Sequence, residues 1–315
     1  MQSLLLDFLK VTESAAVAAM PWVGSGDKIA ADGAATNAMR ENLNKMKMHS
    51  TVVIGEGEID EAPMLYIGEK LGLGGDYEFD IAVDPIEGTT PTVNGQGNAI
   101  TVIAAARKGT LLHAPDMYMK KMAVGPKAKG HIDLDAPIED NIKNVAKTLG
   151  KEIAELNILV QDRPRHQEYI ARIRKTGAKV TLFNDGDVIF AIATCIESLG
   201  VDMFLGIGGA PEGVLGAVAT RSMGGEMQAK LLPRNDDEIN RCKEMGIVNF
   251  ESVLMQDDLV RTDDCLLVAT GITDNIIING IETNDDSYVT SSILVNGREK
   301  QVRYVKSVYP VKQMV

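Results

Sequence analysis

The chain opens with two segments in which apolar residues recur every three to four positions, at 3–20 and 33–47. This spacing places the apolar side chains on one face of a helix, so two helices are predicted. Two short apolar runs follow, TVVI at 51–54 and FDIAVD at 79–84, and both end in turns that contain glycine or proline. Such runs are typical of strands that are buried on both faces.

Two further apolar stretches, 98–106 and 109–116, lie on either side of Lys108-Gly109. A glycine at this place is typical of a tight turn, so the pattern predicts a hairpin.

From about residue 140 the pattern alternates between amphipathic helical segments and short apolar runs. The predicted helices are 140–150, 164–177, 187–196 and 210–224, and the predicted strands are 156–160, 178–183 and 202–207. This alternation favours an α/β arrangement with largely parallel strands. The tail, with apolar runs at 265–273, 287–295 and 300–308, predicts further strands.

These segments predict a mixed α/β chain (α+β in part) with two packed lobes, 1–139 and 140–315. The first lobe carries the candidate metal and phosphate chemistry, and the second is the α/β lobe. A chain of 315 residues, 45% of them hydrophobic, is long enough to bury one large core or two moderate ones.

The sequence predicts a cytoplasmic protein. No apolar run approaches the ~18 residues of a membrane span, and the N-terminal apolar stretch contains acidic residues, unlike a signal peptide. The three cysteines, Cys195, Cys242 and Cys265, stand far apart without a Cys-x-x-Cys pair. We therefore expect reduced, buried thiols.

The 32 basic and 44 acidic residues give a net charge of −12, and the basic residues form no long block. Nucleic acids and anionic membranes are therefore not expected partners. A protein this acidic needs local positive charge to bind an anionic substrate, from metal ions, a few lysines and arginines, or helix N-termini.

Acidic residues gather in three glycine-containing segments, GDKIAADG at 26–33, GEGEID at 55–60 and DPIEGT at 84–89. Pro85 cannot continue a central strand, so we expect the chain to turn directly after Asp84 and to bring Glu87 back beside it. Acidic residues that follow strands often only solvate the ends of loops. For any one of these acids, taken alone, that role is the alternative to a role in a functional site.

Gly88 allows a close approach of the backbone, and Thr89 is suited to begin the next segment with free N–H groups. Two carboxylates beside such groups can hold a metal ion and the phosphate oxygen that it coordinates. Oxygen ligands without histidine or cysteine favour Mg²⁺ or Mn²⁺ over Zn²⁺.

The motif DPIEGT resembles the signature of the lithium-sensitive, metal-dependent sugar and inositol phosphatases. VIGEGEIDEAPMLYIGE, at 53–69, resembles one branch of them, the class II (GlpX-type) fructose-1,6-bisphosphatases. Further matching segments are GDKIAADGAA (26–35), APDMYMKK (114–121), RPRH (163–166), DGDV (185–188), GIGGAPEGV (206–214) and RCKEMG (241–246). They follow the family's order over nearly the whole chain.

The resemblance implies a layered α-β-α-β-α sugar-phosphatase fold, a homo-oligomer (dimer or tetramer), and hydrolysis of the 1-phosphate of fructose-1,6-bisphosphate in gluconeogenesis. It implies two divalent ions, Mn²⁺ or Mg²⁺. The implied ligands are Asp32 and Glu56 for one ion, and Asp84, Glu87 and Glu212 for the other. Two such ions can hold a water and the phosphoryl oxygens for an in-line displacement.

Catalytic roles are expected for Thr89, which could orient or deprotonate the water, with help from Glu56 or Asp60, and for Lys28 in support. The implied substrate contacts are Glu87, Gly88, Thr89, Tyr118, Arg163, Pro164, Arg165, Asp185, Gly186, Asp187 and Gly209. Arginines suit the second phosphate, and aspartates can accept hydrogen bonds from sugar hydroxyls.

Two features depart from the family pattern: Thr90 stands where an arginine is expected, and the stretch 232–241 is short. Two alternatives stay open, a phosphatase that also accepts sedoheptulose-1,7-bisphosphate and a phosphosugar-binding protein without catalysis. A nucleotide site is not favoured, because Pro211 interrupts the glycine pattern of 206–213. The four scattered histidines indicate no Ser-His-Asp arrangement.

Overall fold

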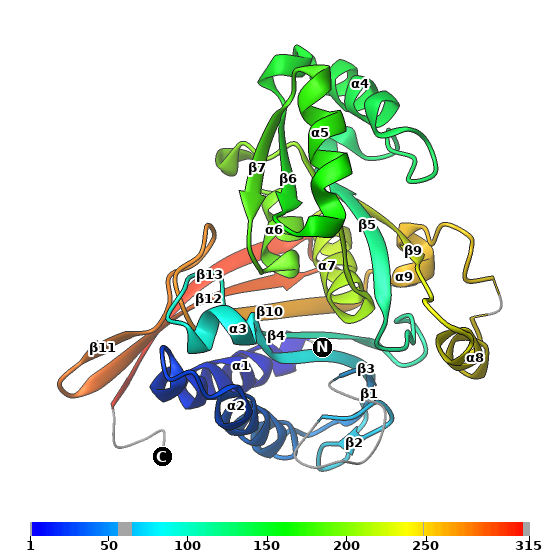
Figure 1. The fold of residues 1–315 in the computed structure, drawn as a ribbon. Coiled ribbons are helices and arrows are strands. Elements are labelled where there is room, and N and C mark those ends of the chain that lie inside the picture. The colour runs from blue at the N-terminus through cyan, green and yellow to red at the C-terminus, as the bar shows by residue number, and fades with distance from the viewer. Residues whose placement is uncertain (1, 56–64, 248, 311–315) are drawn as a thin grey trace. The chain divides into compact units, whose positions relative to one another are not determined.

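The computed structural model describes residues 2–55, 65–247 and 249–310 (Figure 1). The chain forms two compact units. Unit 1 comprises residues 1–111 with 264–315, and unit 2 comprises residues 112–263. Each unit has its own β-sheet and helices, so the predicted mixed α/β class is confirmed. The units divide the chain differently from the expected lobes 1–139 and 140–315, because the last strands return to the sheet that the first strands begin.

Unit 1 is built on an eight-stranded sheet with the order β11-β12-β10-β4-β3-β1-β2, in which β13 pairs with β12. Its strands are β1 His49–Ile54, β2 Lys70–Leu71, β3 Glu78–Glu87, β4 Ile100–Arg107, β10 Cys265–Gly271, β11 Glu282–Asn284, β12 Ser287–Asn296 and β13 Gln301–Pro310. Its helices are α1 Leu5–Ala19, α2 Lys28–Leu43 and α3 Thr89–Val93, with 3-10 turns at Gln2–Leu4 and Met20–Trp22. Strands β1 and β3 are parallel, and the other pairs are antiparallel.

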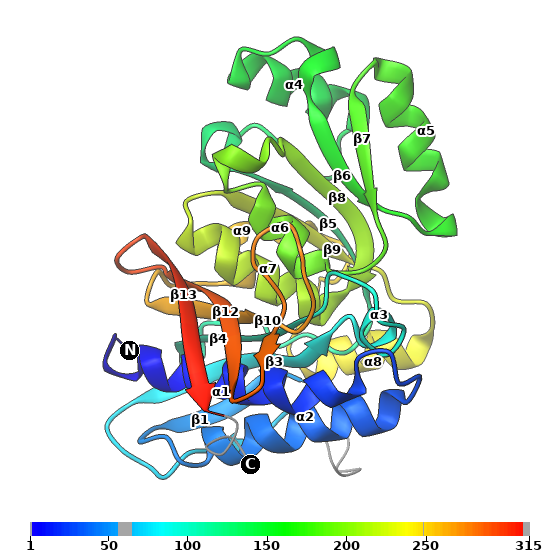
Figure 2. The same cartoon turned by 90° about the vertical axis from the view of Figure 1, so that its left-hand side faces the viewer.

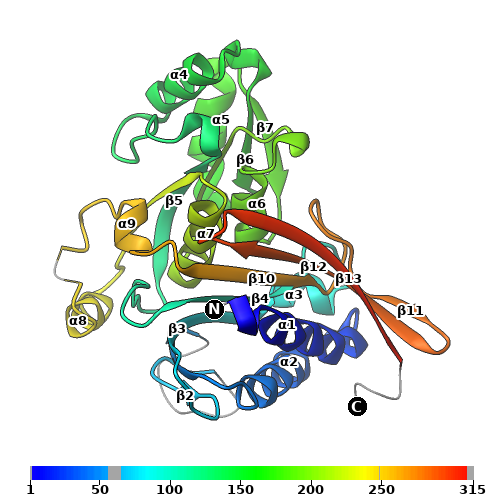
Figure 3. The same cartoon turned by 180° about the vertical axis from the view of Figure 1, so that it is seen from behind.

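Helices α1 and α2 lie side by side and pack on one face of this sheet (Figure 2). Phe8 and Met39, one from each helix, are fully buried in a core with side chains of the six strands β1, β2, β3, β4, β10 and β12. Helix α1 also carries a buried carboxylate, Glu13, which accepts hydrogen bonds from Thr290 (2.7 Å) and from the hydroxyl of Tyr309. The N-terminal helix is thereby tied to the last strands, β12 and β13, which lie next to each other in Figure 3.

Unit 2 contains a five-stranded sheet with the order β7-β6-β8-β5-β9. Its strands are β5 Tyr118–Val124, β6 Asn157–Gln161, β7 Lys179–Phe183, β8 Met203–Gly209 and β9 Glu226–Leu231. Its helices are α4 Ile138–Leu149, α5 Gln167–Thr176, α6 Asp187–Ala193, α7 Ala210–Ser222, α8 Asp236–Glu244 and α9 Gln256–Leu259, with 3-10 turns at Pro126–Ala128, Ile153–Glu155, Pro164–His166 and Glu197–Leu199.

Helices α4 and α5 cover one face of the second sheet, where their apolar residues join the core formed by β5, β6 and β8. Helices α6 and α7 pack on the other face, and the rings of Phe183 (β7) and Phe190 (α6) lie 4.0 Å apart. The three strands predicted at 156–160, 178–183 and 202–207 are parallel, as expected. In unit 2 the order of layers is therefore helix, sheet, helix.

The predicted hairpin at Lys108-Gly109 is wrong. Gly109 does turn, with φ +78°, but residues 109–116 form no named strand. Strand β4 pairs instead with β3 and with β10, more than 150 residues later in the sequence. The turn therefore leads out of the first sheet. The sequence around Lys108-Gly109 could not indicate that β4 pairs with the distant strand β10.

Among the described residues no helix is both long and apolar enough to cross a membrane.

Candidate active site

In unit 1 the segment Asp84–Glu87 is a β-bulge. Strand β3 runs on through Pro85 to Glu87, so the expected turn directly after Asp84 is wrong. Asp84 pairs with Val102 and Glu87 with Ile100, so β3 has one residue more than β4 between these pairs. A bulge tolerates proline because the extra residue makes no ladder bond.

The bulge also explains how two acids three positions apart come to project from one side of the sheet. Val102 and Ile100 are two residues apart in β4 and therefore point to the same face. Their partners, Asp84 and Glu87, then share that face. The Asp84 carboxylate accepts a hydrogen bond from the Ile86 amide (3.0 Å), and Glu87 is 4% exposed.

Thr89 is the first residue of α3, as the sequence predicted, and Gly88 before it has φ +92°. Only glycine adopts this left-handed backbone without strain, so it allows the chain to leave the strand and enter the helix directly. The Thr89 hydroxyl lies 3.0 Å from the Asp32 carboxylate and 3.2 Å from the Ile86 carbonyl. Residues 57 positions apart thus meet in one unit.

Asp32 lies on α2, which begins at Lys28 after the Asp27 side chain caps the Ala30 amide. Burial raises the pKa of the Asp32 carboxyl, while the hydrogen bond from Thr89 and the charge of Lys28 act in the opposite direction. Lys28 itself is exposed. Two further expected residues, Glu56 and Asp60, lie outside the described residues.

In unit 2 a tyrosine and two arginines form a cationic group. The guanidinium of Arg165 lies 5.2 Å from the centre of the Tyr118 ring, and that of Arg234 lies 5.0 Å from it. The ring faces attract these cations and keep them close together. Both arginines are largely exposed, so their remaining donors can reach an anionic ligand.

The segment 163–166 is held to the sheet by directed hydrogen bonds. Arg165 donates to the Ile207 carbonyl and to the Gln161 amide oxygen, both at 2.7 Å. His166 is buried between β6 and β8: its Nδ1 lies 2.7 Å from the Gln161 carbonyl, and its Nε2 accepts from the Ile207 amide at 2.8 Å. Burial lowers the pKa of this imidazole, which stays neutral to accept that bond. Pro164 begins the 3-10 turn of this segment.

Asp185 and Asp187 are positioned differently. Asp185 accepts from Arg163 at 2.7 Å and from Gln161 at 3.3 Å, so the predicted phosphate ligand Arg163 and this predicted sugar ligand contact each other. Gly186, between Asp185 and Asp187, has φ +111° and is the N-cap residue of α6. Asp187, the first residue of α6, is paired with the buried Lys121 at 2.6 Å.

Glu212 lies in the first turn of α7, next to Gly209, whose carbonyl accepts from Lys121 at 3.0 Å. Its carboxylate oxygen Oε2 is buried and has no hydrogen-bond partner among the described residues. Burial raises the pKa of this carboxyl, the charge of Lys121 lowers it, and Asp187 raises it. A buried carboxylate oxygen of this kind is costly unless a cation compensates it, so Glu212 fits a metal ligand.

The expected metal ligands are thus distributed over the chain. Asp32, Asp84 and Glu87 belong to unit 1, and Glu212 belongs to unit 2. Within 2–55, 65–247 and 249–310, no group of three His, Cys, Asp or Glu side chains is arranged to hold a metal ion. In unit 1 the structure brings Thr89 into contact with Asp32. In unit 2 it brings Tyr118 into contact with Arg165, and Arg163 into contact with Asp185.

Four residues of these networks were not assigned a role from the sequence: Lys121, Gln161, His166 and Arg234. Lys121 and His166 lie in segments that resemble the family, and a lysine within the apolar strand Tyr118–Val124 is itself a signal, because buried lysines are rare unless paired. Arg234 lies in the short stretch 232–241, where nothing in the local pattern points to Tyr118.

Comparison with known proteins places the chain among sugar phosphatases. The family model for bacterial, glpX-encoded fructose-1,6-bisphosphatase matches residues 2–309. The chain is 47% identical to fructose-1,6-bisphosphatase 1 class 2 of Escherichia coli K12, over 98% of this chain and 95% of that protein. It is also 47% identical to the class 2 enzyme of Haemophilus influenzae (98% and 96%) and 44% identical to fructose-1,6-bisphosphatase 2 class 2 of E. coli K12 (98% and 100%). The chain therefore belongs to the family of GlpX-type bacterial fructose-1,6-bisphosphatases.

Proposed function

We propose that this chain hydrolyses the 1-phosphate of fructose-1,6-bisphosphate to fructose-6-phosphate and inorganic phosphate, a step of gluconeogenesis. Water would attack phosphorus, and the bond between phosphorus and the sugar oxygen would break. The observation that carries the proposal is the arrangement in unit 1, in which the Thr89 hydroxyl bonds to Asp32 beside the bulge that puts Asp84 and Glu87 on one face. Family membership supports the choice of substrate.

Two divalent ions, Mn²⁺ or Mg²⁺, are proposed as cofactors, with Asp32 and Glu56 as ligands of one, and Asp84, Glu87 and Glu212 of the other. When bound, such ions lower the pKa of a water and neutralise charge on the phosphoryl oxygens. The donor set supports this choice, since it consists of hard carboxylate oxygens. The buried oxygen of Glu212 supports it as well.

The residues around Thr89 would orient the attacking water. A threonine hydroxyl has one proton to donate and two lone pairs. With that proton directed to Asp32, as the 3.0 Å bond allows, a lone pair of Thr89 is left to accept from water. Glu56 or Asp60 would assist in taking the water proton, and Lys28 would contribute positive charge beside Asp32.

Unit 2 would bind the sugar and the second phosphate. Arg163 and Arg165 would hold that phosphate, Tyr118 would offer a ring face and a hydroxyl, and Asp185 and Asp187 would accept from sugar hydroxyls. The backbone around Gly186 and Gly209 would permit close approach of the ligand in unit 2, and that around Gly88 would do so in unit 1. Support comes from the hydrogen bonds that hold Arg165 and His166 to the sheet, because a ligand site needs fixed side chains.

The test is phosphate release from fructose-1,6-bisphosphate by the purified chain with Mn²⁺, with Mg²⁺ or with EDTA. Sedoheptulose-1,7-bisphosphate and inositol-1-phosphate serve as comparison substrates. Metal-dependent release from the fructose ester alone is the expected result. Complete inactivity of a folded, metal-loaded protein would contradict the proposal and direct attention to Thr90, which is exposed on α3.

We also propose a cytoplasmic location and a homo-oligomer, dimer or tetramer, as the active form. The free thiols Cys195, Cys242 and Cys265 agree with a reducing compartment. In the last strand, β13, the exposed fractions of Tyr304 and Val308 are 57% and 66%, which is apolar surface that a second copy could cover. The molar mass from light scattering, with 33.9 kDa for one chain, tests the assembly.

A further inference from the structure

Lys121, on strand β5, is buried, with 1% of its side chain exposed. Its ammonium donates to Asp187 Oδ2 at 2.6 Å and to the carbonyl oxygen of Gly209 at 3.0 Å. Both partners are among the proposed substrate contacts, and all three residues belong to unit 2. The ammonium therefore connects three elements, β5, the start of α6, and the junction between β8 and α7.

The glycines of the segment 206–213 make room for this lysine. A Cβ at Gly208 would lie 2.2 Å from Asp187 Oδ2 and 3.0 Å from Lys121 Nζ. A Cβ at Gly213 would lie 3.2 Å from Lys121 Cδ and 2.4 Å from Met119 Sδ. A Cβ at either position could be accommodated only if the ion pair or the side chains around it moved. These two glycines thus serve packing around Lys121.

The electrostatic surroundings show why the ammonium is needed. Asp187 is nearly buried at the first turn of α6, and its charge requires a nearby cation. Lys121 engages one carboxylate oxygen, Oδ2, and holds the side chain in one orientation. The second oxygen, Oδ1, is then left in a fixed direction, which is what recognition of a sugar hydroxyl requires. Lys121 is also near enough to Glu212 for its charge to act on that carboxylate.

We propose that Lys121 is a positioning residue of the sugar site, which acts through Asp187 rather than by touching the reacting atoms. The inference rests on the proposed function, because it assigns Asp187 and Gly209 to sugar recognition. It predicts that loss of the ammonium weakens sugar binding more than it slows the chemical step.

The test is Lys121→Met, which keeps the unbranched stem and removes the charge. The matched control is Lys120→Met: Lys120 is the next residue of β5, and its ammonium bonds instead to the Leu134 carbonyl at 2.9 Å. We expect Lys121→Met to raise KM for fructose-1,6-bisphosphate at least tenfold with a smaller change in kcat. The Kd of fructose-6-phosphate, measured by calorimetry without metal, should rise in parallel. Lys120→Met should change both constants by less than about twofold.

Action through Asp187 is tested by the double variant Lys121→Met/Asp187→Asn. If Lys121 acts through this carboxylate, the double variant binds fructose-6-phosphate no more weakly than Asp187→Asn alone. The inference would be overturned if the two substitutions raised the Kd of fructose-6-phosphate by the product of their separate factors. A folded Lys121→Met protein with parental KM and Kd would overturn it as well. If Lys121→Met does not fold, the double variant, which removes both charges, is compared with Asp187→Asn. An equal Kd of fructose-6-phosphate in these two proteins supports the inference, and weaker binding by the double variant overturns it.

The outcome can be separated from that of the proposed function. If the parent protein releases phosphate from fructose-1,6-bisphosphate and Lys121→Met is unaffected, only the role of Lys121 fails. If the parent protein is inactive on this ester, the proposed reaction fails. In that case the Kd values for fructose-6-phosphate still decide whether Lys121 positions a sugar site.

Discussion

At the scale of single residues, the Thr89 hydroxyl is the group on which the proposed chemistry depends most directly. Thr89→Ala removes the donor to Asp32 and the acceptor for water, both at the half-buried first residue of α3 rather than in the core. We expect a fall in kcat of roughly 10²- to 10⁴-fold, the range of a lost acid–base group. The melting temperature should stay within a few degrees. Thr89→Ser, which keeps the hydroxyl, is the control, and a normal kcat in Thr89→Ala would exclude the role.

Cys195 gives a residue-scale prediction that does not depend on function. Burial raises the pKa of its thiol to about 11. At pH 8 only about one thiol in a thousand is then ionised, and the thiolate is the reactive form. Cys195 is half-buried, so we expect iodoacetamide to modify it at least about tenfold more slowly in the native protein than in guanidinium chloride, as followed by peptide mass spectrometry. Equal rates in the two states would show that the thiol is open to solvent.

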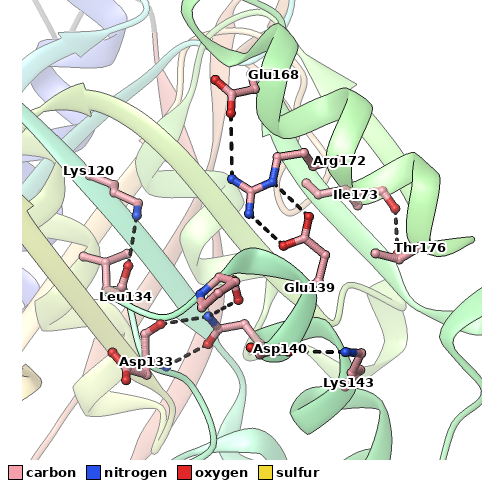
Figure 4. Close-up of polar contacts among 12 residues, drawn as sticks. Lys120, Asp133, Leu134, Glu139, Asp140, Lys143, Glu168, Arg172, Ile173 and Thr176 are labelled. Atoms are coloured by element: carbon pink, nitrogen blue, oxygen red, sulfur yellow. Dashed lines mark hydrogen bonds and ion pairs between the residues drawn. The ribbon is translucent and has the colours of Figure 1, made fainter.

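At the scale of elements, helices α4 and α5 are joined by a two-fold hydrogen-bonded ion pair, Glu139 with Arg172, at 2.9 and 2.7 Å (Figure 4). These hydrogen bonds hold the pKa of Glu139 at about 2, below its ordinary value of 4.5. Since the folded pKa is the lower one, the pair stabilises the protein fully above pH 4.5 and loses this effect as the pH falls toward 2. Both side chains are about one-third exposed, so we expect only ~0.5–1 kcal/mol.

The measurement is the free energy of unfolding of the parent and of Glu139→Gln between pH 7 and pH 3. The advantage of the parent should shrink as the pH drops below 4.5. Lys143→Gln is the control, because its partner Asp140 lies on the same helix at 3.3 Å with both side chains largely exposed. A constant difference between parent and Glu139→Gln over the whole range would rule out this contribution.

The elements also show how far local pattern goes. The helices at 3–20 and 210–224 and the parallel strands of the second half were predicted within a few residues, because helical periodicity and β-branched runs are local signals. Pro85 gave a wrong expectation, since a bulge accommodates it within β3. The hairpin at Lys108-Gly109 was also wrong, because pairing of β4 with β10 depends on residues far away in sequence.

At the scale of the whole molecule, the chain leaves unit 1 after residue 111 and returns at residue 264. The ends of unit 2 are joined by the hydrogen bond from the Leu112 amide to the Leu259 carbonyl at 3.0 Å, and the unit has its own core. We expect the fragment 112–263 to fold alone, with cooperative thermal unfolding by circular dichroism.

The matching truncation removes residues 264–315 and should prevent unit 1 from folding, because it deletes β10 to β13 from the eight-stranded sheet and the partners of Glu13. Aggregation or loss of the cooperative transition of unit 1 is the expected result. A soluble truncated chain that keeps both transitions would show that the last strands are dispensable.

By itself the sequence determined the fold class, the family, and the identity of the candidate residues, because helical period, strand composition and short motifs are written in adjacent positions. The tertiary structure alone decided which of those residues meet. It brought Thr89 to Asp32 and Lys121 to Asp187, and it paired the first strands with the last. These contacts join residues dozens or hundreds of positions apart, and their energies depend on burial and on distances that no local pattern encodes.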